Sequence, residues 1–234
     1  MPVNEIIEKK YRNEIKYLCS DMQLALIEAR IKHICHKDAH VGASGQYAVR
    51  SVYFDDCDNS CFYDNIDGVN VREKMRIRIY DGNMEYITLE CKQKRNGKNH
   101  KDSCRLTREQ CDAILKGTYT VKEEDADLIK KLVALQQMKL MRPKVIVQYD
   151  RTPYVYGPGN VRITFDRNIS GCGNIDEFGN RDIPLKRVLT PGYHVLEVKY
   201  DEFFPEFIRR EMELDGLQHT AFSKYALCRK TIGL

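Results

Sequence analysis

Basic and apolar residues alternate along the segment from Arg72 to Tyr80. Lys74, Arg76 and Arg78 occupy every second position, with methionine or isoleucine between them. Side chains two residues apart in a strand lie about 6.6 Å apart on one face, so the segment presents a row of cations on one side and apolar side chains on the other. Like charges aligned in this way repel each other. The pattern therefore indicates either a face that binds an anion or an ordinary solvent-exposed sheet face.

Other predicted strands show the same alternation. After a turn at residues 81–83, polar residues including Glu90 and Lys92 alternate with Ile87, Leu89 and Cys91. Further strands are expected at 11–17, 145–152, 161–167 and 193–200. If helices bury the apolar faces, the charged faces point either to solvent or into a closed barrel. The cations on these faces are Lys16, Arg76, Arg78, Lys92, Arg151, Arg162 and Lys199.

Such a barrel would hold too few carboxylates to neutralise its cations. Burying a cation costs several kcal/mol unless the cation is paired, and the accompanying acids are only Glu14, Glu90 and Glu197. A phosphate chain would supply the missing charge, because guanidinium groups bind its oxygens in a bidentate manner. Glutamates among the cations would then suit a divalent metal ion that bridges phosphate oxygens.

Other kinds of chemistry find little support. We find no Ser-His-Asp set, no Walker loop and no Cys-His dyad, so phosphoryl transfer through positioning and charge stabilisation fits what remains. The net charge of +4 is too mild for a general nucleic-acid binder. The basic residues also lack interleaved aromatic residues on which bases would stack. We therefore expect no nucleic-acid partner.

The cysteines and the hydropathy indicate where the protein works. Nine cysteines are present without a CxxC pair, which favours reduced thiols and a cytoplasmic location. No apolar run approaches the length of about 20 residues that a membrane helix needs, and the N-terminus lacks the features of a signal peptide. The sequence therefore predicts a cytoplasmic protein without a membrane segment.

Helical spacing predicts helices between and after the strands. One follows a cap at Ser20 and runs to Ile34, and others cover 107–115, 125–141, 206–214 and 222–229. The polar stretch 95–101 contains a glycine and is expected to form a loop. With 234 residues and no convincing linker, we expect a single α+β domain over residues 1–234.

Several short motifs occur in the order found in a known family. The chain resembles the VTC domain, the polyphosphate-polymerase domain of the vacuolar transporter chaperone complex, which belongs to the triphosphate tunnel metalloenzymes and is related to the CYTH proteins. The resemblance covers residues 11–227 and implies a closed antiparallel barrel of eight strands with helices packed outside. The motifs that carry it are Ser51-Val52-Tyr53-Phe54-Asp55, Arg76-Ile77-Arg78, Arg142-Pro143, Arg151-Thr152, Arg162-Ile163, Val195-Leu196-Glu197-Val198-Lys199 and Phe222-Ser223-Lys224.

The resemblance also implies an activity and a set of site residues. The implied reaction transfers the γ-phosphoryl group of ATP to a growing inorganic polyphosphate chain, with Mn²⁺ or Mg²⁺, and releases ADP. Glu197 is implied as the metal ligand and Glu90 as a second one. The implied phosphate-binding cations are the seven basic residues named above, and Ser223, Lys224, Lys101 and Tyr149 are further substrate contacts. Export of the product would need a separate membrane-protein partner.

The sequence departs from the family pattern at two positions. Ala221 stands where the fungal domains carry a lysine, which weakens the grip on phosphate at one end of the tunnel. Arg12 replaces the first glutamate of the wider superfamily's N-terminal signature, as in the VTC branch. Two alternatives therefore stay open beside the polymerase. One is a tunnel hydrolase of tripolyphosphate or nucleoside triphosphates, and the other is a polyphosphate-binding module without activity.

Overall fold

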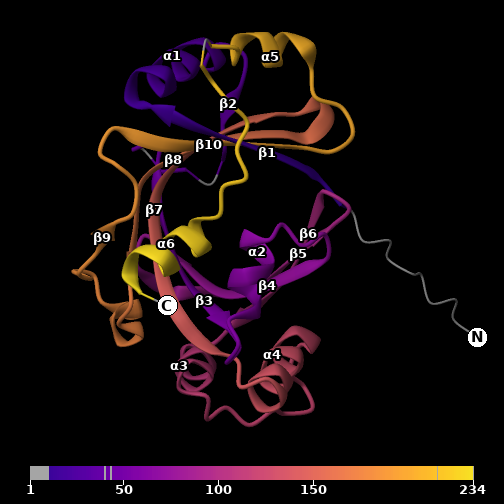
Figure 1. Ribbon diagram of the computed structural model, residues 1–234, viewed down its shortest axis with the longest axis vertical. Coiled ribbons are helices and arrows are strands. Elements are labelled where there is room, and N and C mark those ends of the chain that lie inside the picture. Colours follow the sequence, from indigo (N-terminus) through magenta and orange to yellow (C-terminus); the bar gives the residue numbers. More distant parts are fainter. Residues whose placement is uncertain (1–10, 40, 43, 215, 234) are drawn as a thin grey trace, which may run out of the picture.

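One antiparallel sheet forms the body of the protein (Figure 1). The computed structural model of the chain describes residues 11–39, 41–42, 44–214 and 216–233. Eight strands of the sheet form a path in the order β1-β10-β8-β7-β3-β4-β5-β6, while β2 pairs with β7 and β9 with β8. The strands are β1 (Asn13–Ser20), β2 (His36–Lys37), β3 (Tyr47–Asp55), β4 (Arg72–Tyr80), β5 (Asn83–Arg95), β6 (Lys98–Leu106), β7 (Arg142–Tyr156), β8 (Val161–Cys172), β9 (Lys186–Arg187) and β10 (Tyr193–Tyr200).

Helices cover the sheet in three places (Figure 1). The helices α3 and α4 lie at one end, α1 and α5 lie at the other, and α2 and α6 lie between them. In the described segments, no helix is long and apolar enough to span a membrane. The helices are α1 (Asp21–Ile31), α2 (Ser60–Ile66), α3 (Arg108–Lys116), α4 (Asp127–Met138), α5 (Glu206–Glu211) and α6 (Lys224–Ile232), with short 3₁₀ turns η1 (Pro158–Asn160) and η2 (Ile175–Gly179).

The sheet curls into a half-barrel that is open between its edge strands, β1 and β6. Within the described residues, backbone pairing between these edges is limited to Arg12 and Asn99, which exchange hydrogen bonds of 2.8 and 2.9 Å. The expected closed barrel is therefore wrong. The antiparallel α+β architecture and the path of eight strands are confirmed.

The edge strands β1 and β6 separate because the β5–β6 hairpin ends close to Arg12. The hairpin turns at Asn96-Gly97, so β1, running antiparallel to β6, passes the tip of the hairpin soon after Arg12. Farther along β1, the edge pairs with the segment before α6 instead, where the Thr220 N–H donates to the carbonyl of Lys16 at 2.9 Å. The segment before α6, which has no regular secondary structure there, thus lies where β1 and β6 would continue to pair in a closed barrel.

The alternation in the strands sorts the side chains onto the two faces of the sheet. The apolar residues of β4 and β5 pack under α3 and α4, for example Ile77 and Leu89 with Ile114 and Leu132. Those of β8 and β10 pack under α1 and α5. The opposite, concave face carries the charged rows, and α6 covers part of it with Tyr225, Ala226 and Cys228. The concave face is therefore the place where a charged site can form.

Two hairpin turns and two helix caps follow directly from the sequence. Asp81-Gly82 joins β4 to β5 with positive φ at both residues, as a two-residue hairpin turn requires. Ser20 and Thr107 cap α1 and α3 through capping boxes. The loop expected over 95–101 is wrong, because β5 continues through Arg95 and β6 begins at Lys98. Only Asn96-Gly97 turns, which is a favoured hairpin pair.

Candidate functional site

Three cations surround the carboxylate of Glu90 on the concave face. Arg76 and Glu90 are opposite each other on β4 and β5, and the Arg76 guanidinium donates to Glu90 from Nε at 2.7 Å and contacts it through Nη2 at 2.6 Å. Lys101 lies 2.8 Å and Arg78 3.5 Å from the same carboxylate. Burial opposes ionisation of Glu90, but the three cations together lower its pKa below the ordinary value. Glu90 therefore holds the arginines in place.

A second cluster joins β1, β5 and β10. Lys16 is opposite Glu197, and Glu14 is opposite Lys199, in the β1–β10 ladder. Lys92 donates to Glu14 at 2.7 Å, and Lys199 lies 2.7 Å from Glu197. Lys16 bridges the two acids at 3.0 Å from Glu14 and 3.7 Å from Glu197. Because strand pairing brings both carboxylates to one place, three lysines and two glutamates form one network.

A third cluster is centred on Asp166, which was not among the predicted site residues. Its fully buried carboxylate accepts two hydrogen bonds from Arg151, at 2.7 and 2.8 Å, and lies 2.6 Å from Lys224. Glu197 links this cluster to the second one, at 4.0 Å from Arg151 and 3.9 Å from Lys224. Asp166 alternates with Arg162 and Thr164 on one strand face, and that spacing could have identified it.

Tyr149 and Arg162 take different places around this network. The Tyr149 hydroxyl accepts from Arg78 at 3.4 Å, and its ring lies 4.8 Å from the Nζ of Lys224. Arg162 is more exposed and binds Asp38 at 2.9 Å. Tyr149 therefore connects two clusters, whereas Arg162 lies at the margin of the network.

Lys74 is a further cation of the site that the prediction left out. Its Nζ donates to the hydroxyl of Ser223 at 3.1 Å, and no ion pair joins it to a carboxylate among the described residues. Burial lowers the pKa of Lys74 to about 7, with repulsion from Lys16 and Lys92 adding to the effect. Burial also lowers the pKa of Lys92 to about 7 despite its contact with Glu14. The site therefore holds two lysines whose charged forms its own acids do not fully stabilise.

A count of the groups in contact supports the same conclusion. In the described part of the chain, this region gathers ten basic side chains and five carboxylates, so the bases outnumber the acids by five. The basic residues are Lys16, Lys74, Arg76, Arg78, Lys92, Lys101, Arg151, Arg162, Lys199 and Lys224, and the acids are Glu14, Asp38, Glu90, Asp166 and Glu197. An excess of bases over acids in a site that is partly buried favours an anionic ligand.

The acids differ in how well they suit a metal ion. Across the described residues, no group of three or more His, Cys, Asp or Glu side chains could hold a metal ion alone. Glu14 and Glu197 lie on adjacent strands and share Lys16 and Lys199. Mg²⁺ commonly uses one or two carboxylates together with substrate phosphates and water. This pair fits such an ion when phosphate supplies the other ligands, and Glu90, which lies among Arg76, Arg78 and Lys101, stays a predicted second ligand.

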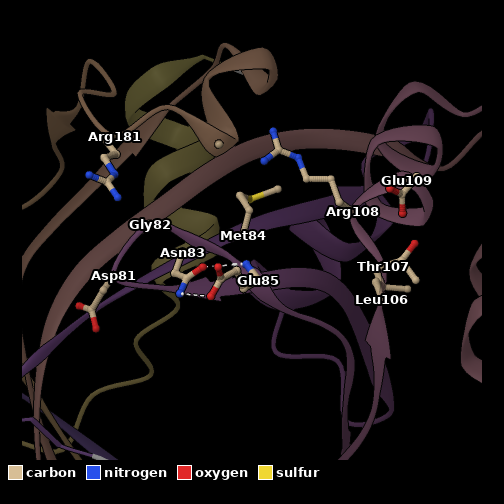
Figure 2. Close-up of a pocket in the computed structure, with 11 residues that line it drawn as sticks. Asp81, Gly82, Asn83, Met84, Glu85, Leu106, Thr107, Arg108, Glu109 and Arg181 are labelled. Atoms are coloured by element: carbon tan, nitrogen blue, oxygen red, sulfur yellow. Dashed lines mark hydrogen bonds between the residues drawn. The ribbon is translucent and has the colours of Figure 1, made fainter.

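A groove elsewhere on the molecule has a different character (Figure 2). It has a volume of about 850 Å³ and is formed by the β4–β5 turn, the start of α3 and the segment around Gly179. Figure 2 shows the guanidinium groups of Arg108 and Arg181 on either side of Met84. Its lining residues include none of the predicted site residues and carry three acids against two bases. We therefore place the candidate site on the concave face and not in this groove.

Comparisons with known proteins identify the family. The model of the VTC domain matches residues 11–232. The chain belongs to the VTC domain family. No curated protein matches it. Comparison of this VTC domain protein with other proteins therefore relies on the family model and on the fold.

Several solved structures share the fold of this VTC domain protein. A Hippeastrum adenylyl cyclase candidate, described as having a dominant triphosphatase activity, is 14% identical, with a TM-score of 0.54 over 95% of this chain and 97% of the other. An adenylate cyclase candidate from Bacillus halodurans is 14% identical with a TM-score of 0.50, covering 88% and 87% of the two chains. A Pyrococcus horikoshii protein is 14% identical with a TM-score of 0.50, over 94% and 99%. At these identities the likeness is one of fold.

Proposed function

We propose that this protein is an ATP-dependent polyphosphate polymerase. It would transfer the γ-phosphoryl group of ATP to the end of an inorganic polyphosphate chain and release ADP. The observation that supports this most directly is the gathering of ten basic side chains with only five carboxylates in one region of the concave face. A chain of phosphates is the ligand whose length and charge match such a row of cations.

The arginines would bind the phosphate oxygens and orient the chain. Arg76 and Arg151 are each held by a buried carboxylate through two contacts, so their free guanidinium N–H groups point in fixed directions. Positioning of this kind can supply much of the rate enhancement in phosphoryl transfer. Lys74 and Lys92, whose pKa values are lowered to about 7, would become fully charged when a polyanion lies beside them.

Glu14 and Glu197 would hold Mn²⁺ or Mg²⁺ together with phosphate oxygens. The metal ion, when bound, supplies charge neutralisation at those oxygens. The carboxylate of Glu197 is ionised and can therefore bind a cation. Burial opposes its ionisation, but Lys199 and Lys16 together with other cations lower its pKa well below the ordinary value. When the ion binds, Lys199 and Lys16 would lose part of their contact with the Glu197 carboxylate and would contact phosphate instead.

The transfer step conserves atoms and charge without a covalent enzyme intermediate. An oxygen of the terminal phosphate of the acceptor chain would attack the γ-phosphorus of ATP. The bond between that phosphorus and the β–γ bridging oxygen would break, and ADP would leave with the electron pair. The cations would stabilise the charge on the equatorial oxygens during the step.

A triphosphatase is the second candidate. The similar Hippeastrum structure is described as having a dominant triphosphatase activity, and Ala221 removes a lysine that the fungal polymerases carry. The two reactions differ only in whether water or a phosphate oxygen attacks the γ-phosphorus. A binding module without activity would have no use for the carboxylate pair of Glu14 and Glu197.

The deciding experiment follows both products at once. Purified protein is incubated with ATP and Mn²⁺, while a gel detects long-chain polyphosphate and a separate assay detects free phosphate. We expect chains to accumulate together with ADP. Free phosphate without chains would identify the hydrolase, and tight polyphosphate binding with neither product would identify the binding module. The variant Glu197→Gln serves as a control that should give neither product.

A further inference from the structure

A buried carboxylate outside the cation network connects three parts of the structure. Asp55, at the end of β3, is fully buried. It accepts hydrogen bonds from the backbone N–H groups of Asp56, Cys61 and Phe62, at 3.0, 2.9 and 3.1 Å, and thereby fixes the start of α2. It also accepts from the hydroxyl of Tyr225 in α6. One side chain therefore ties β3 and α2 to α6.

Arg229 completes this connection from the next turn of α6. Its guanidinium donates to the Tyr225 hydroxyl at 3.1 Å and to the side chain of Asn59 at 2.8 Å, and lies 3.9 Å from Asp55. Tyr225 and Arg229 are 2% and 3% exposed. Hydrogen bonds are directional, so these contacts constrain both the rotation of α6 about its axis and its position along that axis. We refer to Asp55, Tyr225 and Arg229 as the α6 anchor.

Apolar packing alone would leave α6 less constrained. The helix approaches β8 closely at Gly171, where an added Cβ would lie 2.5 Å from Ile232 and 3.2 Å from Cys228. This packing sets the distance between helix and sheet. Apolar contact is not directional, so it permits small rotations of the helix. The anchor is the part of the structure that selects one rotation.

The rotation of α6 decides where two candidate substrate contacts point. Ser223 caps the helix and accepts from Lys74 at 3.1 Å, and Lys224 lies 2.6 Å from Asp166. Tyr225 is the next residue along the helix. Because neighbouring helical side chains have a fixed angular separation, fixing Tyr225 also fixes the direction of Lys224.

The anchor also touches the arginine part of the site. The ring of Tyr225 stacks on Tyr53, with ring centroids 5.2 Å apart. The Tyr53 hydroxyl accepts from Arg76 at 2.8 Å, and Arg76 is held from its other side by Glu90. The same tyrosine pair therefore keeps Lys224 and Arg76 in one arrangement.

We propose that the α6 anchor is a set of positioning residues that aligns Ser223 and Lys224 with the phosphate-binding cations. The inference rests on the proposed function, in that Ser223 and Lys224 are taken to bind phosphate. The anchor residues do not contact the substrate themselves. The Tyr225 ring stacks on Tyr53, whereas the contacts of the Tyr225 hydroxyl set the rotation of α6 and so act through Lys224. Removal of the hydroxyl therefore tests the coupling to Lys224.

The test is a double-mutant cycle read by binding and not by activity. Isothermal titration with tripolyphosphate compares the wild type, Tyr225→Phe, Lys224→Met and the double variant. Tyr225→Phe keeps the ring and its stacking but loses the hydrogen bonds of the hydroxyl. We expect each single variant to weaken binding about fivefold to tenfold, and Tyr225→Phe to change it less than about twofold when Lys224 is already methionine.

A matched control separates positioning from a general loss of stability. Tyr154 is also buried, and its hydroxyl donates to the carboxylate of Glu28 at 3.0 Å in a different core cluster. Tyr154→Phe should leave tripolyphosphate binding unchanged. If Tyr225→Phe lowers the melting temperature more than this control does, Arg229→Lys tests the same coupling with a smaller change, and we expect it to show the same dependence on Lys224.

The outcomes distinguish this inference from the proposed function. Effects of Tyr225→Phe and Lys224→Met that add independently would overturn the positioning role, as would an equal loss of binding in Tyr154→Phe. A wild-type chain that binds tripolyphosphate but makes no polymer would reject the polymerase and leave the anchor standing. A wild-type chain that does not bind tripolyphosphate would overturn both.

Discussion

Polyphosphate binding should draw a proton onto Lys74. In the free protein, burial lowers the pKa of this lysine to about 7, and repulsion from Lys16 and Lys92 adds to the shift. A phosphate chain beside Lys74 would favour its charged form and return the pKa toward the ordinary value of 10.5. Binding above pH 7 must therefore be accompanied by proton uptake, and affinity must fall as the pH rises.

The size of the effect follows from the pKa of about 7. At pH 8, Lys74 is about nine-tenths neutral, so binding should take up about 0.9 proton on this residue. At pH 6 the same residue is already charged, and the uptake falls to about 0.1 proton. Through this one group, each pH unit above 7 should weaken binding by up to about tenfold, which corresponds to about 1.4 kcal/mol.

Isothermal titration in buffers of different ionisation enthalpy measures this uptake. Metal-free tripolyphosphate is titrated at pH 6 and pH 8 into the wild type and into Lys74→Met. The difference between the two proteins removes proton exchange by the ligand itself. Lys116→Met, at an exposed position at the end of α3, is the matched control and should behave as the wild type.

Equal proton uptake by the wild type and Lys74→Met at pH 8 would refute the reasoning. The same lowered pKa also determines how the free energy of unfolding changes with pH. The folded state binds fewer protons than the unfolded state between pH 7 and the ordinary lysine pKa of 10.5, so the buried charge destabilises the protein at low pH and stability rises through this window. Lys74→Met should reduce this rise and leave the part that Lys92 contributes through its own lowered pKa, as measured by urea unfolding at several pH values.

Three other substitutions test the remaining parts of the site. Arg76→Lys keeps the charge but loses the bidentate fork and should weaken tripolyphosphate binding about tenfold, whereas the same change at the exposed Arg105 of β6 should have no effect in a competition assay. Glu197→Gln should abolish metal-dependent turnover while polyphosphate binding persists or tightens; unchanged turnover would exclude Glu197 as the metal ligand. Asp166→Asn should lower the free energy of unfolding by about 3 kcal/mol, because two buried cations lose their carboxylate. Saturating tripolyphosphate should restore part of this loss in urea unfolding, and a loss below about 1 kcal/mol would contradict the assignment.

The faces of the strands could be predicted from the sequence because side-chain direction in a strand is a local property. The alternation of Lys74, Arg76 and Arg78 with apolar residues fixed which side is charged, and the turn at Asp81-Gly82 brought Glu90 next to Arg76. The same local rule grouped the other cations on one face of each strand, but it left open whether that face meets solvent or the inside of a barrel.

Pairings between strands far apart in the chain could not be predicted in this way. Arg151 and Asp166 are opposite each other on β7 and β8 only because of the register of those strands, which single-strand patterns do not determine. The contact between Lys74 and Ser223 depends on the path of the chain before α6. These long-range contacts complete the site.

The failure of the barrel to close has a local origin that the sequence does contain. Asn96-Gly97 is a strong hairpin signal, but the surrounding basic residues made the whole stretch resemble a loop. Once the hairpin ends there, β6 cannot continue along β1. The position of this two-residue turn thus limits how far β6 can pair with β1.

The open side of the sheet has a consequence for how a long polymer reaches the site. The β1–β10 edge is held by a ladder of eight residue pairs, whereas the segment across the opening is held to β1 through Thr220 and through the Lys16 side chain, which donates to the carbonyl of Phe222 at 2.9 Å. Displacing this segment breaks far fewer bonds than peeling away a strand. Under the proposed function, a polyphosphate chain would therefore enter the site sideways at any point along its length, without a free end having to be threaded through a ring.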